Sequence, residues 1–155
     1  AMLVRKLVGQ IKRYKGTISV GIISPYLAQV ERLKHLEIHS TPYGELDDVG
    51  NESKTSVSIR VNTVDSFQGQ ECDIIIFTAV RSNNFSNIGF LDDERRLNVA
   101  ATRARYSFIL ICSASTVSSN KTWGRLIENS KQRQTFQNSS TNNTIADTSR
   151  KIKNE

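Results

Sequence analysis

The sequence predicts an α/β fold in which a parallel β-sheet is covered on both faces by helices. Segments with strand character alternate along most of the chain with segments that have helical periodicity. The strand-like segments are continuous apolar runs, which is typical of strands buried on both faces. Ligands of such sheets bind at the carboxyl ends of the strands, so the residues that follow each strand are candidates for function.

The first elements are a helix and a strand. Residues 2–14 carry apolar side chains on one helical face and basic side chains on the other, and Gly16 ends this helix. Residues 17–23, TISVGII, are short and rich in β-branched side chains, so they are predicted to form a buried strand.

A second helix is expected directly after this strand. Ser24 is predicted to be its N-cap and Pro25 its first residue, and the helix extends over residues 26–37. One stripe of this helix is apolar: Leu27, Val30, Leu33 and Leu36. In residues 38–55 Gly, Pro, Asp, Asn and Ser dominate, which indicates a loop or the site of a shortened element.

The middle of the chain is predicted to contain two further strands. Residues 57–61 form one strand, and residues 73–80, DIIIFTAV, are the most apolar run and the best candidate for a central strand. Between them, residues 65–71 are expected to turn around Gly69 at the carboxyl edge of the sheet. Residues 82–89 are expected to form a loop.

The last elements are a helix, a strand and a final helix. The first helix starts at Asp92 or Asp93 and contains residues 94–105; its inward residues are Leu97, Ala100, Ala101 and Ala104. Residues 107–112, SFILIC, form a strand. In the final helix, residues 121–133, the apolar face consists of Trp123, Leu126 and Ile127.

Composition divides the chain into one domain and a tail. Residues 1–133 of the 155 are enough to bury one core, whereas residues 134–155 are almost without apolar side chains and are expected to be disordered. The formal net charge of +6 is compatible with a polyanionic partner. Two cysteines, Cys72 and Cys112, indicate buried reduced thiols and exclude a disulfide-rich scaffold. No apolar run has the roughly 20 residues that a membrane span needs, so no membrane partner is expected.

Several chemical motifs are absent. The sequence has no GxxxxGK[ST] phosphate loop, no HExxH, no CxxC and no GxSxG. His35 and His39 have the i, i+4 spacing of a helical metal pair, but no third ligand is near them in sequence, so they are expected to be solvated and no metal site is predicted.

Arginines cluster around the helix that starts near Asp93, and they are Arg95, Arg96, Arg103 and Arg105. A guanidinium is permanently charged and makes planar bidentate contacts, which suits phosphate. The alternative is a basic helix face paired with the neighbouring carboxylates of Asp92, Asp93 and Glu94.

Three segments resemble, in order, the last motifs of superfamily 1 helicases of the Upf-like group, which includes the nonsense-mediated-decay helicase and senataxin. VGIISPYLAQV is similar to motif IV, VNTVDSFQGQECDIIIFTAVRSN to motif V, and IGFLDDERRLNVAATRAR to motif VI. The resemblance extends over about residues 20–133. Ala101 and Glu94 depart from it, since the group usually has Leu and commonly Pro at these positions.

The resemblance implies a RecA-like fold of the P-loop NTPase superfamily and the second of two motor domains, without a P-loop of its own. ATP and Mg²⁺ would be bound mainly by an N-terminal RecA-like domain of the same parent chain, so this chain alone would be inactive. The other partner would be single-stranded nucleic acid, RNA or DNA, and the location intracellular, nuclear or cytoplasmic.

The resemblance also implies residue roles at the nucleotide. Arg103 aligns with the motif VI arginine that reaches the γ-phosphate, where a guanidinium stabilises developing charge. Glu71 aligns with the glutamate that hydrogen-bonds the ribose hydroxyls. Gly69 would let the backbone pass close to the nucleotide, and Gln68 would relay nucleotide state. Arg96 and Arg105 would support this site.

The same resemblance implies a track for nucleic acid. Its residues are Ser24, Pro25 and Tyr26 from motif IV, and Thr63, Asp65 and Ser66 from motif V. Small hydroxyls and backbone N–H groups at such positions bind phosphate without reading sequence. Two alternatives stay open: Tyr26 as a core or rim aromatic, and Ser24 as a plain helix cap.

The function that follows is the C-terminal motor domain of an ATP-dependent RNA or DNA helicase. The alternatives are a non-catalytic module that keeps the fold to bind nucleic acid or protein, and a degenerate fragment without function.

Overall fold

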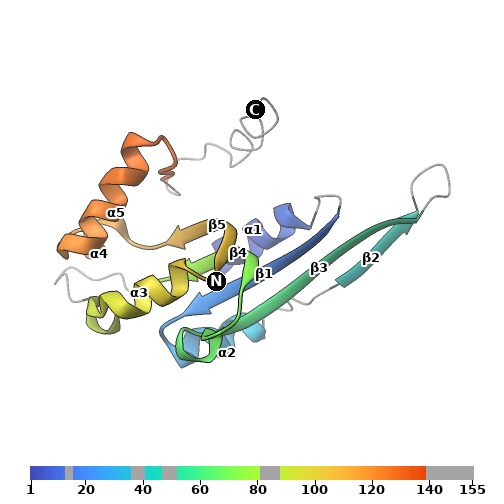
Figure 1. The fold of residues 1–155 in the computed structure, drawn as a ribbon, viewed down its shortest axis with the longest axis horizontal. Helices are drawn as coiled ribbons and strands as arrows, with labels where there is room; N and C mark the ends of the chain where they lie inside the picture. Colours follow the sequence, from blue (N-terminus) through green and yellow to red (C-terminus); the bar gives the residue numbers. More distant parts are fainter. Residues whose placement is uncertain (13–15, 36–40, 47–51, 81–87, 139–155) are drawn as a thin grey trace.

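A five-stranded sheet forms the centre of the protein, with the strand order β2-β3-β1-β4-β5 (Figure 1). The computed structural model describes residues 1–12, 16–35, 41–46, 52–80 and 88–138. The strands are β1 (Thr17–Ser24), β2 (Thr41–Leu46), β3 (Glu52–Thr63), β4 (Cys72–Thr78) and β5 (Ala104–Ile111). β3, β1, β4 and β5 run parallel, as predicted, whereas β2 is antiparallel to β3.

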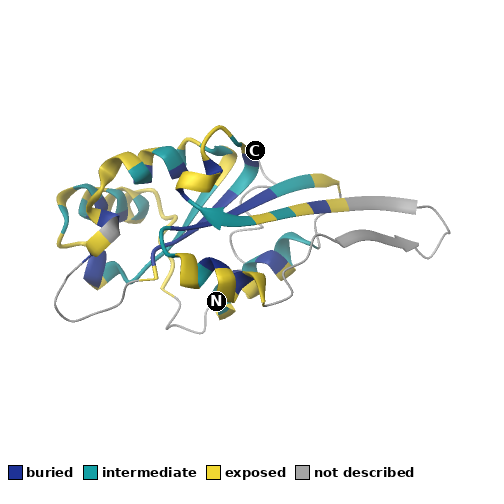
Figure 2. Ribbon diagram, turned by 90° about the horizontal axis from the view of Figure 1, so that it is seen from below, coloured by how far each residue is buried: buried dark blue, intermediate teal, exposed yellow. Residues whose placement is uncertain are grey.

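Helices cover both faces of this sheet, and Figure 2 shows the buried strands between them. The helices are α1 (Met2–Ile11), α2 (Leu27–Lys34), α3 (Glu94–Ala101), the short α4 (Ala114–Val117) and α5 (Lys121–Gln132), with 3₁₀ turns η1 (Asp65–Phe67) and η2 (Gly89–Asp92). On one face, α1 and α2 pack on the sheet through Val4, Val8 and Leu33. On the other, α3 and α5 pack through Leu97, Ala100, Trp123 and Ile127. The predicted α/β sandwich is therefore confirmed.

The connection from β3 to β4 crosses β1 without an α-helix. Phe67 of η1 is fully buried in the core. It packs against Gly21 of β1, where a Cβ would lie 2.7 Å from the Phe67 ring and 2.5 Å from Ile75 Cδ1. Gly21 thus leaves the space that Phe67 needs. The packing of Phe67 on Gly21 holds the crossover over β1, between the carboxyl end of β3 and the amino end of β4.

The expected loop over residues 38–55 is wrong in part. Residues 41–46 form β2 and β3 already begins at Glu52, so two strands of a hairpin occupy much of this segment, while residues 36–40 and 47–51 lie outside the described part of the chain. The strand signal is weak there because an edge hairpin needs no continuous apolar run.

The predicted limits of two helices also need correction. α3 ends at Ala101 rather than at Arg105, and Ala104 belongs to β5. α2 begins at Leu27, whose side chain is 63% exposed rather than part of the buried stripe. Within the described residues, no helix is long and apolar enough to cross a membrane. The predicted disorder of residues 134–155 falls mostly on residues outside the described ranges.

Both thiols are free, as predicted, but only Cys72 is fully buried, and Cys112 is half-buried. Burial raises the pKa of Cys112 to about 11, and it also raises that of Cys72. Burial thus disfavours the thiolate form of both side chains.

Candidate functional site

The candidate residues lie at the two opposite ends of the parallel strands. We call the side at which the strands begin the amino edge, and the side at which they finish the carboxyl edge. Glu71 directly precedes β4, Arg103 directly precedes β5, and Arg105 is the second residue of β5. The backbone N–H of Cys72 donates to the carbonyl of Arg103 at 3.0 Å, so the two chain segments meet. The expectation that residues 65–71 all lie at the carboxyl edge is wrong for Glu71, because the crossover starts at the carboxyl end of β3 and ends at the amino end of β4. We call Glu71, Arg103 and Arg105 the amino-edge group.

Arg103 lies in the turn that follows α3 and is half-buried. Its Nε donates to the carbonyl of Val99 at 3.1 Å, and its Nη2 donates to the hydroxyl of Thr102 at 3.2 Å. Among the described residues no carboxylate pairs with it. A guanidinium held by a carbonyl of the last helical turn keeps its full positive charge and has further N–H groups to offer to an anion.

Glu71 and Arg105 form an ion pair beside Arg103. The Nε of Arg105 donates to Oε2 of Glu71 at 3.2 Å, and their side chains are 55% and 53% exposed. An exposed pair of this kind contributes about 0–1 kcal/mol to stability.

Asp73 and Ser19 extend this arrangement into the sheet, and sequence reasoning missed both. Oδ2 of Asp73 accepts hydrogen bonds from the backbone N–H of Ser19 at 2.8 Å and from its hydroxyl at 2.7 Å. In return, the backbone N–H of Asp73 donates to Oγ of Ser19 at 2.9 Å. The bonds from Ser19 lower the pKa of Asp73 below its ordinary value. The signal in the sequence is a carboxylate at the start of an apolar strand, which must find a donor on a neighbouring strand.

Gln68 and Gly69 lie on the crossover that leads to Glu71, and both are exposed. Gly69 has a φ of +78°, a conformation that favours glycine. A Cβ at Gly69 would meet no atom within 4 Å, so the backbone conformation, rather than crowding within the chain, selects glycine here. The space in front of this backbone is open to a ligand.

At the carboxyl edge, Thr63 and Ser66 are bonded to each other. The hydroxyl of Thr63 donates to that of Ser66 at 3.0 Å and accepts the backbone N–H of Ser66 at 3.3 Å. These contacts start the 3₁₀ turn η1, in which Asp65 and Ser66 are exposed.

Ser24 ends β1 and has no exposed surface. Its hydroxyl donates to the carbonyl of Thr78 at 3.3 Å and accepts the N–H of Tyr26 at 3.3 Å. Ser24 is therefore not the N-cap of α2; that position is held by Tyr26, without a side-chain cap. Pro25 and Tyr26 are half-buried at the rim, and the Tyr26 hydroxyl donates to the carbonyl of Ile88 at 3.5 Å. A buried Ser24 side chain can shape the track but offers no surface to a strand.

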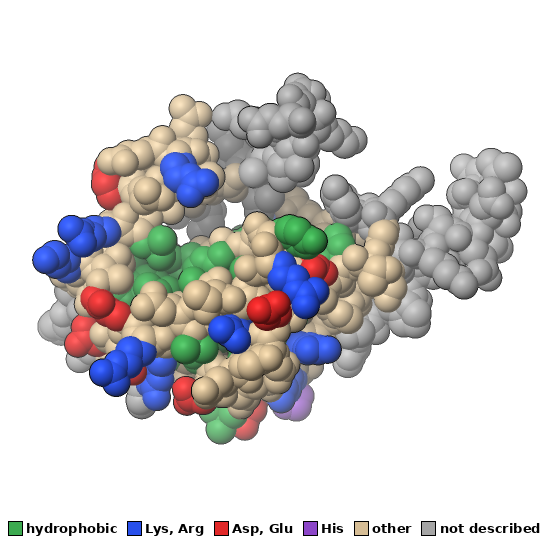
Figure 3. Space-filling view, in the orientation of Figure 1, with side chains coloured by type: hydrophobic (Ala, Val, Ile, Leu, Met, Phe, Trp, Pro, Cys, Tyr) green, Lys and Arg blue, Asp and Glu red, His purple; other side chains and the backbone are tan. Residues whose placement is uncertain are grey.

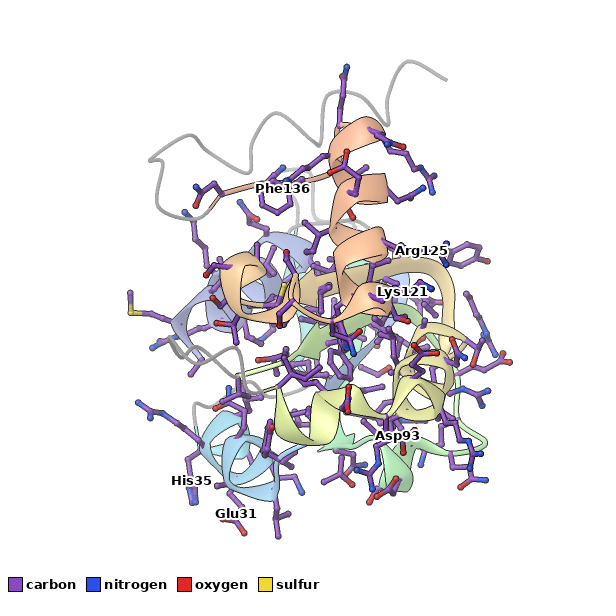
Figure 4. All side chains as sticks on the ribbon, turned by 90° about the vertical axis from the view of Figure 1, so that its left-hand side faces the viewer. Glu31, His35, Asp93, Lys121, Arg125 and Phe136 are labelled. Carbon is purple, nitrogen blue, oxygen red and sulfur yellow. The ribbon has the colours of Figure 1, made fainter. Side chains whose placement is uncertain are left out.

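Arg96 lies near the carboxyl edge. It is away from Glu71 and Arg103, with which the family resemblance grouped it. Its Nε is 3.7 Å from Oδ1 of Asp65 and 4.0 Å from Oδ2 of Asp93. Asp93, labelled in Figure 4, caps α3 by accepting the N–H of Arg95 at 3.0 Å. Arg96 thus contacts carboxylates on two elements.

The other two carboxylates of this region bind α5 instead of arginines. Oδ1 of Asp92 accepts from the side-chain amide of Asn120 at 2.9 Å, and Glu94 accepts from the hydroxyl of Thr122. The side chain of Trp123 donates to the carbonyl of Leu91 at 2.7 Å. The interpretation of the arginines as one basic face paired with Asp92, Asp93 and Glu94 therefore holds only for Arg96 and Asp93 among the described ion pairs.

The described residues contain no group of three or more His, Cys, Asp or Glu side chains that could hold a metal ion. His35 is exposed at the end of α2 and points away from the sheet (Figure 4), while His39 lies outside the described residues.

A parallel sheet with helices on both faces, together with an arginine turn at its amino edge, defines the class as a RecA-like domain of the P-loop NTPase superfamily. The AAA domain family matches residues 1–115, and the chain belongs to it.

Relatives narrow the class further. The chain is 39% identical to "Probable helicase MAGATAMA 3" of Arabidopsis thaliana over 132 residues, which cover 85% of the chain and 15% of the relative. It is 42% identical to "Regulator of nonsense transcripts 1" of Dictyostelium discoideum over 114 residues, 74% of the chain and 8% of the relative. It is 37% identical to "Helicase sen1" of Schizosaccharomyces pombe over 131 residues, 84% of the chain and 7% of the relative. The chain is therefore a RecA-like domain of the Upf-like group of superfamily 1 helicases, and it spans only a small part of these relatives.

Proposed function

We propose that the chain acts as the C-terminal motor domain of an ATP-dependent helicase that moves on single-stranded RNA or DNA. Arg103 is the arginine finger, Glu71 binds the ribose hydroxyls, and Gln68, Gly69 and Arg105 support the nucleotide site. Arg96 supports it indirectly from the carboxyl edge, through the contact of α3 with Asp65 on the crossover. ATP and Mg²⁺ are held mainly by an N-terminal RecA-like domain. The observation that carries this proposal is the meeting of Glu71 and Arg103 through the hydrogen bond from Cys72.

The chemistry of the amino-edge group supports this assignment. Phosphoryl transfer places negative charge on the oxygens of the transferred group, and a preplaced guanidinium stabilises that charge. Arg103 has no carboxylate partner among the described residues, so its charge is not already neutralised. A second cation, Arg105, is partly neutralised by Glu71 at 3.2 Å and suits orientation better than charge stabilisation.

We assign the track to the opposite edge. Exposed Asp65 and Ser66, half-exposed Thr63, and the rim residues Pro25 and Tyr26 surround the carboxyl ends of β1 and β3. Ser24 supports this edge from inside through its bond to Thr78. Hydroxyls and backbone N–H groups at such an edge recognise phosphates without reading bases.

The test is a chimaera in which residues 1–133 replace the matching segment of a helicase relative that carries a P-loop upstream. Strand-stimulated ATPase and duplex unwinding are measured with the chimaera, the parent relative and the isolated chain. We expect the chimaera to hydrolyse ATP and unwind, and the isolated chain to show no measurable ATPase, since its sequence has no phosphate loop.

Two outcomes contradict the proposal. A folded chimaera that binds single strands without hydrolysing ATP would make this domain a non-catalytic binding module. Robust ATPase of the rigorously purified isolated chain, lost on Arg103→Ala, would refute the need for an N-terminal domain.

A further inference from the structure

The two oxygens of the Asp73 carboxylate face different residues. Oδ2 receives both donors of Ser19, at 2.8 and 2.7 Å, whereas Oδ1 lies 4.0 Å from Nη1 of Arg105. Because β1 and β4 are adjacent strands in the sheet, the anchor of this carboxylate is part of the rigid core. The Asp73 side chain is only 22% exposed, whereas the side chains of Arg105 and Glu71 are 55% and 53% exposed.

Arg105 lies between two carboxylates. Its Nε donates to Oε2 of Glu71 at 3.2 Å, while its Nη1 lies 4.0 Å from Oδ1 of Asp73, an ion-pair distance without a hydrogen bond. The guanidinium is planar, so contacts at two of its nitrogens determine the orientation of the whole group.

Glu71 would otherwise be poorly ordered. Its side chain is 53% exposed, and an exposed ion pair alone contributes little and costs side-chain entropy. Among the described residues, Oε2 has Arg105 as its hydrogen-bond donor and Oε1 has no partner. An oriented carboxylate with one free oxygen is suited to accept from a hydroxyl of the ligand.

We propose that Asp73, anchored by Ser19, is a positioning residue that fixes Arg105 and through it orients Glu71 toward the ribose hydroxyls of ATP. The orientation is a property of this chain, and its effect on ATP rests on the function proposed above.

The first test measures the orientation in the chain itself, without nucleotide. The ¹⁵N order parameter of the Arg105 Nε–H group is measured in the wild type and in Asp73→Asn, Ser19→Ala and Ser19→Thr. We expect a value in the range of ordered groups in the wild type and a value below about 0.6 in Asp73→Asn and Ser19→Ala. Ser19→Thr keeps the hydroxyl and should restore the ordered value.

Asp65→Asn is the matched control, because it removes one carboxylate contact of an arginine, Arg96, at the other edge of the sheet. It should leave the order parameter of Arg105 unchanged. Ser19→Ala is the milder variant and keeps the test valid if Asp73→Asn does not fold. An ordered Arg105 in the folded variants would overturn the proposal.

The second test compares ATP with 2′-deoxy-ATP in the chimaera. Loss of a hydrogen bond to a charged group corresponds to about a tenfold loss in affinity or more, so Glu71→Ala should abolish the preference for ATP. Asp73→Asn and Ser19→Ala should reduce the same preference mainly through KM, with kcat little changed.

The outcomes separate the two proposals. If Glu71→Ala leaves the preference intact, the ribose role of Glu71 fails, and the order parameters alone decide whether Asp73 positions Arg105. If Glu71→Ala removes the preference while Asp73→Asn and Ser19→Ala keep it, the positioning role fails and the ribose role stands.

Discussion

Nε of Arg96 lies 3.7 Å from Oδ1 of Asp65, and this contact joins α3 to the start of the β3–β4 crossover. The other end of α3 leads to Arg103, and the other end of the crossover leads to Glu71. Two elements therefore connect the carboxyl edge with the amino edge, and they touch at both ends, through Arg96 and Asp65 and through Cys72 and Arg103. Under the function proposed above, these two elements would link the strand-binding edge to the nucleotide-binding edge.

Packing of the crossover depends on Gly21. In Gly21→Ala the new Cβ would lie 2.5 Å from Ile75 Cδ1 and 2.7 Å from Phe67 Cζ, so we expect a loss of about 1–3 kcal/mol in the free energy of unfolding. The control is Gly9→Ala in α1, where a Cβ would meet no atom within 4 Å. This substitution should raise the free energy of unfolding by about 0.5–1 kcal/mol, because alanine favours the helix over glycine. Denaturant unfolding measures both, and equal effects of the two substitutions would refute the close packing at Gly21.

Asp73 should make stability depend on pH. Hydrogen bonds from Ser19 lower its pKa in the folded chain from the ordinary value of 3.8, so the unfolded chain binds the proton more tightly. The stabilisation is present above that value and is lost as pH falls through it toward the folded pKa.

Asp73→Asn removes this titration. The difference in unfolding free energy between wild type and Asp73→Asn should therefore shrink as pH is lowered from about 6 to about 3. Denaturant unfolding at several pH values measures it, and a difference that is constant over this range would contradict the assignment.

Much of the fold could be predicted because burial determines it. The continuous apolar segments in β1 and β4 and the periodic face of α5 are direct consequences of packing, and the structure buries Trp123 and Ile127 as expected. Strand β2 and the extension of β3 were missed because a hairpin at the edge of a sheet is not required to be apolar.

For the candidate site, the sequence indicated which residues to consider but not where on the sheet they lie. The resemblance implied roles for Glu71, Arg103 and Arg105, but the edge on which they lie depends on the length of the crossover, which local propensity does not determine. Likewise, Ser24 followed by Pro25 is a strong helix start in sequence, yet the Ser24 hydroxyl bonds to Thr78 on the neighbouring strand. Neither the path of the crossover nor the partner of Ser24 can be read from the neighbouring residues in the sequence.

The isolated chain should bind single strands weakly and in a salt-sensitive way. A net charge of +6 favours a polyanion, while Figure 3 shows acidic side chains interspersed with basic ones on one face, which limits the attraction. We expect dissociation constants of about 10⁻⁶–10⁻⁴ M, with little dependence on base sequence. Fluorescence anisotropy with labelled oligonucleotides measures this, and equal affinity at low and physiological salt would exclude backbone recognition.

The sharpest prediction concerns Arg103 in the chimaera. Arg103→Ala removes the guanidinium that would reach the γ-phosphate, whereas the P-loop and the metal carboxylates of the upstream domain still hold ATP. We therefore expect nucleotide affinity to fall modestly and turnover to fall by roughly 10³–10⁵-fold. Arg103→Lys should rescue little, since an ammonium group cannot reproduce the planar fork.

Arg105→Ala is the matched control, because it removes the same charge two residues away. It should cost less turnover, since Arg105 is paired with Glu71 at 3.2 Å and acts through that glutamate. Binding of single strands without nucleotide should be nearly unchanged in both variants, because the residues proposed for the track lie at the carboxyl edge. Steady-state ATPase at saturating single strand, with nucleotide affinity measured separately, distinguishes the roles. Turnover near that of the wild type for Arg103→Ala would leave Arg103 as a charge that caps α3 through Val99 and would remove the catalytic assignment.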